Sequence, residues 1–512
     1  ASFYYCDNIT PYVLATALAL SFYGILRLLE SWSHDPREPP LVNHAIPFLG
    51  PIIEMLRHKT RFYLRMKRNH NLPMYTLRVP GSRIYVVNSV PLISAVQKQY
   101  RTLSWITLLG HAIRWIFGTS QAVDEVMARD MTTEAGFLLG INKASFPALA
   151  PGPSLDAMNT AASQAFAAAV SFLPWVRSQI LLGTTDAIYG PQNPFRDPSV
   201  AEAWNNFRPG IRNLGPKALP SFLTSRSIRA REHVVQALMN YFQAGHHQTG
   251  SEMLRARYAY IVDRHGIHDL ADLARLELSG AFASIENTVP TTFWFLCRLF
   301  SDPVVLDDCR RELLPLVKTR NGMSYVDIDA IKASCPILQS TLHETIRYHS
   351  VVMSARKVTE DQVLDNKYLL KKGSTLLISA TVPHFDSEAW GPDVAQFKHT
   401  RFLQDGQGRD TTGKGTQRAA FRGFGGGYHL CPGRHFSVTE MLSLAAMLIL
   451  RFDVTPVAGT WDILLGSDDV SSDGTAAPVP VHDFPVIFSP RSHGKWEFFV
   501  SGSGKHMELL AE

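Results

Sequence analysis

The chain has 512 residues, a formal net charge of +5, 46% hydrophobic residues and 19% charged residues. This composition is typical of a globular protein with a large core, and so mild a charge gives no reason to expect a nucleic-acid partner. The five cysteines are scattered without a C-x-x-C spacing, which argues against a disulfide framework and a structural zinc site and favours reduced surroundings such as the cytosol.

The first notable segment is apolar. Residues 10–26 contain no charged side chain, and about 17–25 such residues are needed to cross a bilayer. The basic start and small-residue cleavage site of a secretory signal peptide are not evident. Asp7 precedes the segment and Arg27 and Arg37 follow it, so the positive-inside rule places the body of the protein on the cytosolic side. We expect residues 1–32 to be a retained, single-pass membrane anchor.

A proline-rich segment, residues 33–51, follows the apolar stretch. Prolines make a stiff, extended spacer, so we expect a hinge that stands a catalytic body, residues 52–512, off the membrane. Residues 52–69 mix basic and apolar side chains. They fit either a solvated helix face or a surface attracted to anionic headgroups, and the sequence does not choose between these interpretations.

The body is predicted to be mainly α with a smaller β region. A hairpin is expected at 74–87, where β-branched and aromatic residues flank a Pro-Gly turn. Apolar periodicity predicts helices, and residues 183–210 contain enough Gly, Pro and Asn to be loop-rich. The expected helices include 163–173, 232–243, 253–262 and 270–300. Strands are expected at 368–370 and 375–379, and a last hairpin at 484–500.

The most informative stretch runs from Phe424 to Gly433, with sequence FGGGYHLCPG. Its glycines permit backbone angles closed to other residues, and Pro432 suits the start of a helix predicted over residues 434–451. A sulfur at a helix N-terminus is favoured as the thiolate, so Cys431 suits an axial ligand of haem iron. A free cysteine is otherwise most often a small buried apolar residue.

Several positions of this stretch are constrained at once, in the pattern Phe-x-x-Gly-x-His-x-Cys-x-Gly. The pattern resembles the cysteine-ligand loop of the cytochrome P-450 superfamily, the haem-thiolate monooxygenases. The resemblance implies a triangular-prism fold with an N-terminal transmembrane helix, haem b (iron protoporphyrin IX) as cofactor, and Cys431 as the metal ligand. The other cofactor-binding positions that it implies in this stretch are Phe424, Gly427, His429 and Gly433.

Two side chains are implied as partners of the haem propionates. His429 stands where the family usually has Arg, and Arg356 matches the family position that begins the strand region. The family's Trp-x-x-x-Arg spacing is missing, because residues 154–172 contain no basic residue.

A second motif is His343-Glu344-Thr-Ile-Arg347. A zinc protease would need a second His in place of Arg347. Glu344 and Arg347 can meet on one helix face, which alone indicates little more than an ion pair. In this chain the motif resembles the family's K helix, with Arg401 as the third member of a buried structural triad that braces the haem side.

The third motif lies at residues 280–290. Pro290 removes the hydrogen bond to the carbonyl of Glu286, which predicts a kink. A plain proline kink is the simpler interpretation, but the segment resembles the oxygen-binding groove of the family. The resemblance implies Glu286, Asn287 and Thr288 as catalytic residues, with Asn287 in the usual threonine slot. That exchange resembles the microsomal branch with steroid 7α- and 12α-hydroxylases and prostacyclin synthase, an isomerase that needs no electrons. Glu286 and Thr288 favour hydroxylation.

Partners follow from the resemblance. No G-x-G-x-x-G follows a predicted strand, so this chain has no visible nicotinamide domain, and a separate NADPH–cytochrome reductase is implied, with cytochrome b5 as a second partner. Basic residues suited to an acidic reductase surface are Lys398, Arg401, Lys414, Arg418, Arg422 and Arg434. We expect a lipophilic substrate (a steroid, terpenoid or other natural-product scaffold) and the endoplasmic reticulum membrane, without nucleic acid. The alternatives are a haem-thiolate isomerase or dehydratase acting on an oxygenated lipid, and a haem-free binding protein.

Overall fold

The computed structural model describes residues 9–131, 133, 135–161, 170–214, 221–403, 414–461, 470–471, 475–480, 485–491 and 494–502. The chain forms two compact units, one of residues 1–105 with 353–383 and one of residues 106–352 with 384–512. Helices dominate and short sheets make up the rest, which confirms the predicted fold class.

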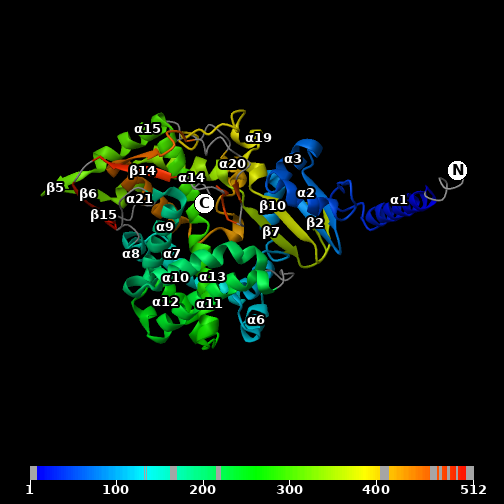
Figure 1. The fold of residues 1–512 in the computed structure, drawn as a ribbon, viewed down its shortest axis with the longest axis horizontal. Coiled ribbons are helices and arrows are strands. Elements are labelled where there is room, and N and C mark those ends of the chain that lie inside the picture. The colour runs from blue at the N-terminus through cyan, green and yellow to red at the C-terminus, as the bar shows by residue number, and fades with distance from the viewer. Residues whose placement is uncertain are drawn as a thin grey trace, which may run out of the picture. The chain divides into compact units, whose positions relative to one another are not determined.

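The first unit is built around a five-stranded sheet of order β1-β2-β10-β7-β3. Its strands are β1 (Met74–Val79), β2 (Ser82–Val87), β10 (Thr375–Ser379), β7 (Met353–Val358) and β3 (Leu103–Ser104). The predicted hairpin is confirmed, because β1 and β2 pair antiparallel around Gly81, whose φ is +69°. Figure 1 shows the blue β2 beside the yellow-green β10 and β7.

Alternation along the strands gives the sheet two apolar faces. Tyr85 and Val87 of β2 belong to one core cluster, which α4 (Val90–Lys98) covers with Leu92 and Ile93. Val86 belongs to the other cluster, which includes Phe62 and Met66 from α3 (Arg61–His70). The helix α2 (Gly50–His58) precedes α3 and packs on β1. Strands β8 (Gln362–Leu364) and β9 (Tyr368–Leu370) form a separate ribbon.

The proline-rich segment is docked on this sheet, and does not stand free of it. Leu41 pairs with Thr76 of β1, and the Thr76 N–H donates to the carbonyl of Pro40 at 2.8 Å. The carboxylate of Glu38 is fully buried, where it accepts a hydrogen bond from the Tyr85 hydroxyl at 2.7 Å and pairs with Arg83 at 3.1 Å. The proline-rich segment, which was expected to be an extended spacer, therefore lies along the β1 edge of the sheet.

Helix α1 (Ile9–Trp32) precedes this segment and projects from the same unit (Figure 1). Among the described residues it is the one helix long and apolar enough to cross a membrane, over Val13–Trp32. Most of its large apolar side chains between Val13 and Trp32 are exposed, Trp32 by 82%, whereas Leu26 is half-buried.

The second unit holds most of the helices. Its first half contains α5 (Ile106–Ala112), the π-helix η1 (Ile113–Phe117), α6 (Gln121–Ala128), α7 (Phe137–Leu149), α8 (Pro153–Ala161), α9 (Phe172–Tyr189), α10 (Pro198–Phe207), the 3-10 helix η4 (Arg208–Leu214), α11 (Ser221–Gln243), α12 (Glu252–Ala259) and η6 (Tyr260–Arg264). Its second half contains α13 (Leu270–Ile285), α14 (Thr288–Ser301), α15 (Pro303–Leu313), α16 (Ile328–Ser334), α17 (Pro336–His349), α19 (Ser387–Trp390), α20 (Lys414–Ala420) and α21 (Arg434–Arg451). The last of these has the predicted bounds, and α14 packs against both α17 and α21.

Three local expectations differ from the structure. Residues 183–210 are largely helical, because Asp197 caps α10 by accepting from the Ser199 N–H and a stripe including Trp204 and Phe207 is buried. The expected final hairpin is wrong: β14 (Pro485–Pro490) pairs with β11 (Phe452–Pro456), whereas β15 (Lys495–Phe499) pairs in parallel with the distant β6 (Met323–Asp327). Of the helix expected at 163–173, residues 163–169 lie outside the described residues, and Val170–Ser171 form strand β4.

Candidate functional site

The cysteine loop precedes α21 in the second unit. Gly425 and Gly427 have φ of +80° and +62°, in the left-handed region that favours glycine, and they turn the chain back so that the Cys431 N–H donates to the carbonyl of Phe424 at 2.9 Å. The α21 helix begins at Arg434, and the Arg434 side chain donates to the Cys431 carbonyl at 3.3 Å. The loop therefore presents one sulfur at the head of a buried helix.

Cys431 is half-buried, as are Phe424 and His429, while Gly427 is exposed and a Cβ at Gly433 would meet no atom within 4 Å. These features fit a flat, bulky group lying against the loop. Burial raises the pKa of the Cys431 thiol above its ordinary value. The backbone N–H of Gly433 and the charge of Arg434 act to lower this pKa, but they offset only part of the rise. A bound metal cation favours the thiolate directly.

At the expected kink the helix is interrupted over two residues, Glu286 and Asn287, which both keep right-handed helical backbone angles. Helix α13 ends at Ile285 and α14 begins at Thr288, leaving Glu286 and Asn287 between them. Asn287 is exposed, whereas Thr288 is only 5% exposed and its hydroxyl donates to the Ser284 carbonyl at 3.2 Å. The amide of Asn287, and not the Thr288 hydroxyl, is therefore the accessible polar group at the break.

The carboxylate of Glu286 is buried, and it pairs with a residue that sequence reasoning missed. Arg208, the first residue of η4, lies 3.6 Å from it through Nε. The same region is aromatic, since Phe207 contacts Phe117 and Phe117 contacts Phe282 of α13. No sequence pattern connects Arg208 to Glu286, because the contact depends on how η4 and α13 pack.

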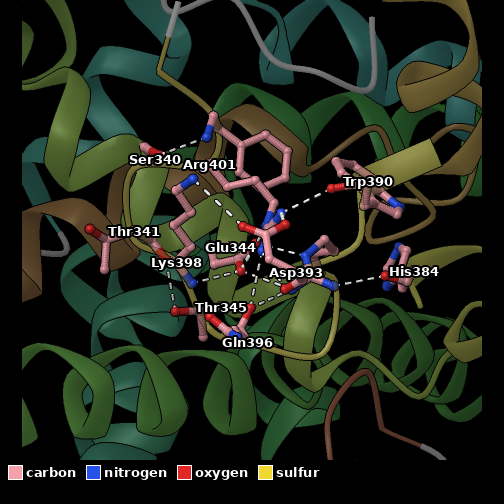
Figure 2. Close-up of polar contacts among 12 residues, drawn as sticks. Ser340, Thr341, Glu344, Thr345, His384, Trp390, Asp393, Gln396, Lys398 and Arg401 are labelled. Atoms are coloured by element: carbon pink, nitrogen blue, oxygen red, sulfur yellow. Dashed lines mark hydrogen bonds and ion pairs between the residues drawn. The ribbon is translucent and has the colours of Figure 1, made fainter. Parts of the chain in front are cut away.

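The structure brings together the predicted charged triad. Arg347 donates to both carboxylate oxygens of Glu344, at 2.7 and 2.8 Å, and Arg401 donates to Glu344 Oε1 at 3.1 Å. The side chains of Glu344 and Arg347 are fully buried and that of Arg401 is 6% exposed. Figure 2 shows Glu344 in the middle of these contacts, with the Lys398 backbone N–H as a further donor at 2.9 Å.

Backbone carbonyls complete the network. Arg401 donates to the carbonyls of Trp390 and Gln396, at 3.0 and 3.1 Å, and pairs with Asp393 at 2.8 Å (Figure 2). With its donors used in this way, Arg401 cannot serve as a surface contact for a reductase. Arg422 is also buried, at 3% exposure. The predicted basic surface therefore loses both of these arginines.

His384 links the triad to the cysteine loop, which sequence reasoning did not anticipate. Its carbonyl accepts from Arg347 at 2.8 Å, and its ring Nε2 accepts from the Arg422 backbone N–H at 2.7 Å. Burial lowers the pKa of His384 to about 3, so the ring is neutral and able to accept. A Cβ at Gly423 would lie 2.1 Å from Ile346, so the loop is also packed closely on α17.

The two expected propionate partners occur in different units. Arg356 lies on β7 in the first unit, 6% exposed, and burial lowers its pKa to about 10. His429 lies in the cysteine loop of the second unit. Among the described residues, no group of three or more His, Cys, Asp or Glu is placed to hold a metal ion.

The fold is mainly helical, and its site combines a cysteine loop, an interrupted helix and a buried Glu-Arg-Arg triad. Comparisons with known proteins identify the enzyme family that has these features. The cytochrome P450 family matches residues 222–471. A cytochrome P450 monooxygenase, nodJ of Hypoxylon pulicicidum, is 31% identical over 97% of this chain and 98% of its own length. A cytochrome P450 monooxygenase of Gibberella zeae is 27% identical over 88% of each chain. Cytochrome P450 7A1 of Rattus norvegicus is 23% identical over 87% of this chain and 92% of its own length.

Solved structures show the same fold. The retinoic acid-bound cyanobacterial CYP120A1 superposes with a TM-score of 0.68 at 20% identity, covering 88% of this chain and 99% of its own. The chain therefore belongs to the cytochrome P450 family, which confirms the resemblance carried by the cysteine loop. It is an oxidoreductase, a haem monooxygenase that acts on a small molecule and takes electrons from a redox partner.

Proposed function

We propose that this protein is anchored in the endoplasmic reticulum membrane by α1 and hydroxylates a lipophilic substrate, a steroid, terpenoid or other natural-product scaffold. O2 is the oxidant, and electrons come from NADPH through a separate reductase, with cytochrome b5 as an optional second donor. The observation that carries the proposal is the Cys431 sulfur at the head of α21, in a loop that only glycines allow.

In this proposal the Cys431 sulfur would bind the haem iron, Gly427 and Gly433 would leave room for the ring, and Phe424 would pack against it. His429 and Arg356 are proposed to hydrogen-bond the propionates. When bound, the haem supplies oxygen activation and C–H oxidation. The protein contributes orientation, exclusion of water and proton supply.

Proton supply is assigned to the break between α13 and α14. The Glu286 carboxylate is the buried acid and the Asn287 amide is the accessible group, donating through its nitrogen and accepting through its oxygen. Thr288 supports the break through its hydrogen bond to Ser284. An amide relays protons less readily than a hydroxyl, so we expect Asn287→Thr to raise the ratio of product to NADPH consumed.

The substrate class is supported by the relatives' names. One relative, 22% identical over 81% of this chain, is the cholesterol 7-alpha-monooxygenase of Cricetulus griseus. A lipophilic scaffold also suits the aromatic side chains Phe117, Phe207 and Phe282 close to Glu286.

The test is spectroscopic. The reduced, CO-bound protein should show the red-shifted Soret band of a thiolate ligand, and Cys431→Ser should lose it. A Cys431→Ser protein that keeps both the band and its turnover would overturn the proposal. Cys309→Ser, a buried cysteine on α15, is the matched control and should keep the band.

Asn287 in the threonine slot does not by itself choose between hydroxylation and the alternative kept from the sequence, a haem-thiolate isomerase or dehydratase acting on an oxygenated lipid. The two functions differ in their need for electrons. Turnover of a substrate by the purified protein without NADPH and reductase would establish the isomerase, and strict dependence on both establishes the monooxygenase.

A further inference from the structure

The buried imidazole of His384 lies between the charged triad and the cysteine loop. His384 is the last residue of the short helix α18 (Thr381–His384), and it has no exposed surface. Its carbonyl accepts from Arg347, which also donates to both carboxylate oxygens of Glu344 (Figure 2). Its ring Nε2 accepts from the backbone N–H of Arg422, in the segment that leads into the loop. One residue therefore bonds to both parts of the candidate site.

The hydrogen bond from Arg422 selects one tautomer of this ring. Burial, together with the charges of Arg347 and Arg422, lowers the pKa of His384 to about 3, so the ring carries one proton. Because Nε2 accepts, that proton is on Nδ1, which is buried and has no hydrogen-bond partner among the described residues. The opposite tautomer would set two N–H groups against each other. The ring therefore offers the Arg422 N–H a single acceptor that is shielded from water.

This contact is followed directly by the turns of the cysteine loop. The Gly425 N–H donates to the Arg422 carbonyl at 3.2 Å, and the Cys431 N–H donates to the Phe424 carbonyl at 2.9 Å. The backbone therefore runs from the amide held by His384 to the amide of Cys431 through two hydrogen-bonded turns. A displacement of Arg422 is passed on to the residue that carries the sulfur.

The residues on either side of Arg422 leave the chain little room to adjust. A Cβ at Gly423 would lie 2.1 Å from Ile346 of α17. On the other side, the ring of Phe421 stacks on the His384 imidazole, with 5.6 Å between the ring centroids. The acceptor atom of His384 thus completes a close-packed attachment of the loop to the triad.

We infer that His384 is a positioning residue for Cys431. Its Nε2 is the atom that couples the Glu344–Arg347 pair to the cysteine loop, and it acts through the Arg422 backbone. This inference rests on the proposed role of Cys431 as the haem ligand and adds a residue that supports that role.

Two substitutions separate the acceptor from the ring. His384→Phe keeps a ring against Phe421 but has no acceptor, whereas His384→Gln has no ring but carries an oxygen about as far from the backbone as Nε2. The full-length, haem-loaded proteins are compared as reduced CO complexes, below the thermal midpoint of each. We expect His384→Phe to lose the thiolate Soret band roughly tenfold faster than the wild type, as for one lost buried hydrogen bond. His384→Gln should lose the band at close to the wild-type rate.

Hydrogen exchange at the Arg422 amide reports the bond itself, without reference to iron. Mass spectrometry of the peptides that cover Arg422 should show faster deuterium uptake in His384→Phe than in the wild type or in His384→Gln. Unchanged uptake in His384→Phe would show that the bond does not hold this part of the loop, and would overturn the inference.

His343 on α17 provides the matched control. Its ring is buried and contacts the same Phe421, but its Nε2 has no hydrogen-bond partner in the part of the chain that the structure describes. His343→Phe should therefore leave both the band and the Arg422 exchange as in the wild type. If His343→Phe and His384→Phe behave alike, the effect belongs to packing around Phe421 and the inference is wrong.

The remaining outcomes are also decisive. A thiolate band that lasts as long in His384→Phe as in the wild type rejects the inference alone, whereas a wild type without this band rejects the proposed role of Cys431. If His384→Phe does not fold or bind haem, His384→Gln is compared with His384→Asn, whose oxygen is too close to the backbone to reach the Arg422 N–H. The inference then requires a longer-lived band in His384→Gln, and equal lifetimes contradict it.

Discussion

The Glu-x-x-Arg motif alone predicts little more than an ion pair, but in the structure the carboxylate of Glu344 is the centre of a buried network. This carboxylate accepts from two arginines and a backbone N–H, with no exposure to solvent. Glu344→Gln leaves Arg347 buried without its counter-charge, which costs about 3–5 kcal/mol. We expect loss of haem content and a lower thermal midpoint. Asp307→Asn, at an exposed pair with Arg311, should cost at most about 1 kcal/mol, and equal losses in the two variants would contradict a special role for Glu344.

Arg208 is expected to hold the Glu286 carboxylate in position. Arg208→Ala removes its partner at 3.6 Å, so we expect proton supply to suffer more than substrate binding. The ratio of product to NADPH consumed should fall severalfold and the release of peroxide should rise, with little change in the substrate-induced spectral shift. Arg226→Ala, at an exposed arginine bonded to Asn206, is the control. Unchanged coupling in Arg208→Ala would show that the ion pair only supports packing.

Glu440 on α21 predicts a pH dependence. It is 5% exposed, one oxygen accepts from the Thr184 hydroxyl at 2.8 Å, and burial raises its pKa to about 8. Because the folded pKa lies above the unfolded value, the contribution of Glu440 to stability is complete below about pH 4.5 and is lost as pH rises towards 8.

The neutral variant Glu440→Gln should therefore remove part of the fall in stability. Between pH 6 and 8 the wild type should lose stability relative to the variant, by up to about 1.4 kcal/mol per pH unit. Thermal midpoints at the two pH values measure this, with the exposed Glu125→Gln as control. Parallel pH profiles of wild type and Glu440→Gln would show that Glu440 is ionised throughout.

At the scale of elements, the break between α13 and α14 depends on proline. Pro290 has no N–H to offer the Glu286 carbonyl. Pro290→Ala should extend the helix through 286–287, leave stability equal or higher, and reduce the ratio of product to NADPH consumed. Pro303→Ala, at the first turn of α15 where proline costs nothing, is the matched control. A Pro290→Ala protein with wild-type coupling would mean that packing alone maintains the break.

Local patterns predicted the elements whose determinants are local. The bounds of α21 follow from its Pro-Gly start and apolar run, and the β1–β2 hairpin follows from its turn. Helix α10 was missed because its proline and asparagines outweighed a cap and four buried residues. The pairing of β15 with β6 could not be predicted, since parallel partners far apart in sequence leave no turn signature.

The residues of the candidate site also fall into two groups, those indicated by a local pattern and those that depend on tertiary packing. Cys431 lies in a motif confined to one loop, and Glu344 and Arg347 lie in a motif confined to one helix turn. Arg401 was implied as the third member of the triad only by the resemblance to the family. His384 and Arg208 could not be found from the sequence, because their contacts depend on tertiary packing. His384 accepts hydrogen bonds through its carbonyl and its ring nitrogen. Arg208 pairs with the carboxylate of Glu286, which is distant in sequence.

For the whole molecule, the proposed anchor predicts fractionation behaviour. With its exposed apolar side chains between Val13 and Trp32, the protein should stay in the membrane pellet after alkaline carbonate and leave it only in detergent. Replacing Leu18 and Leu20 by Lys should release the protein, because charge within the hydrocarbon is costly. Release of the wild type by carbonate would reject a spanning α1.

The docked proline-rich segment limits how this enzyme can be trimmed for crystallisation or soluble expression. A cut placed after residue 45, where the prolines suggest a dispensable linker, would strip Glu38 from Arg83 and Tyr85 and bare the backbone of Thr76 at the sheet edge. A shortened form should instead begin at or before Ser33, so that the new N-terminus lies just after α1 and the pairing of Leu41 with Thr76 along β1 is kept.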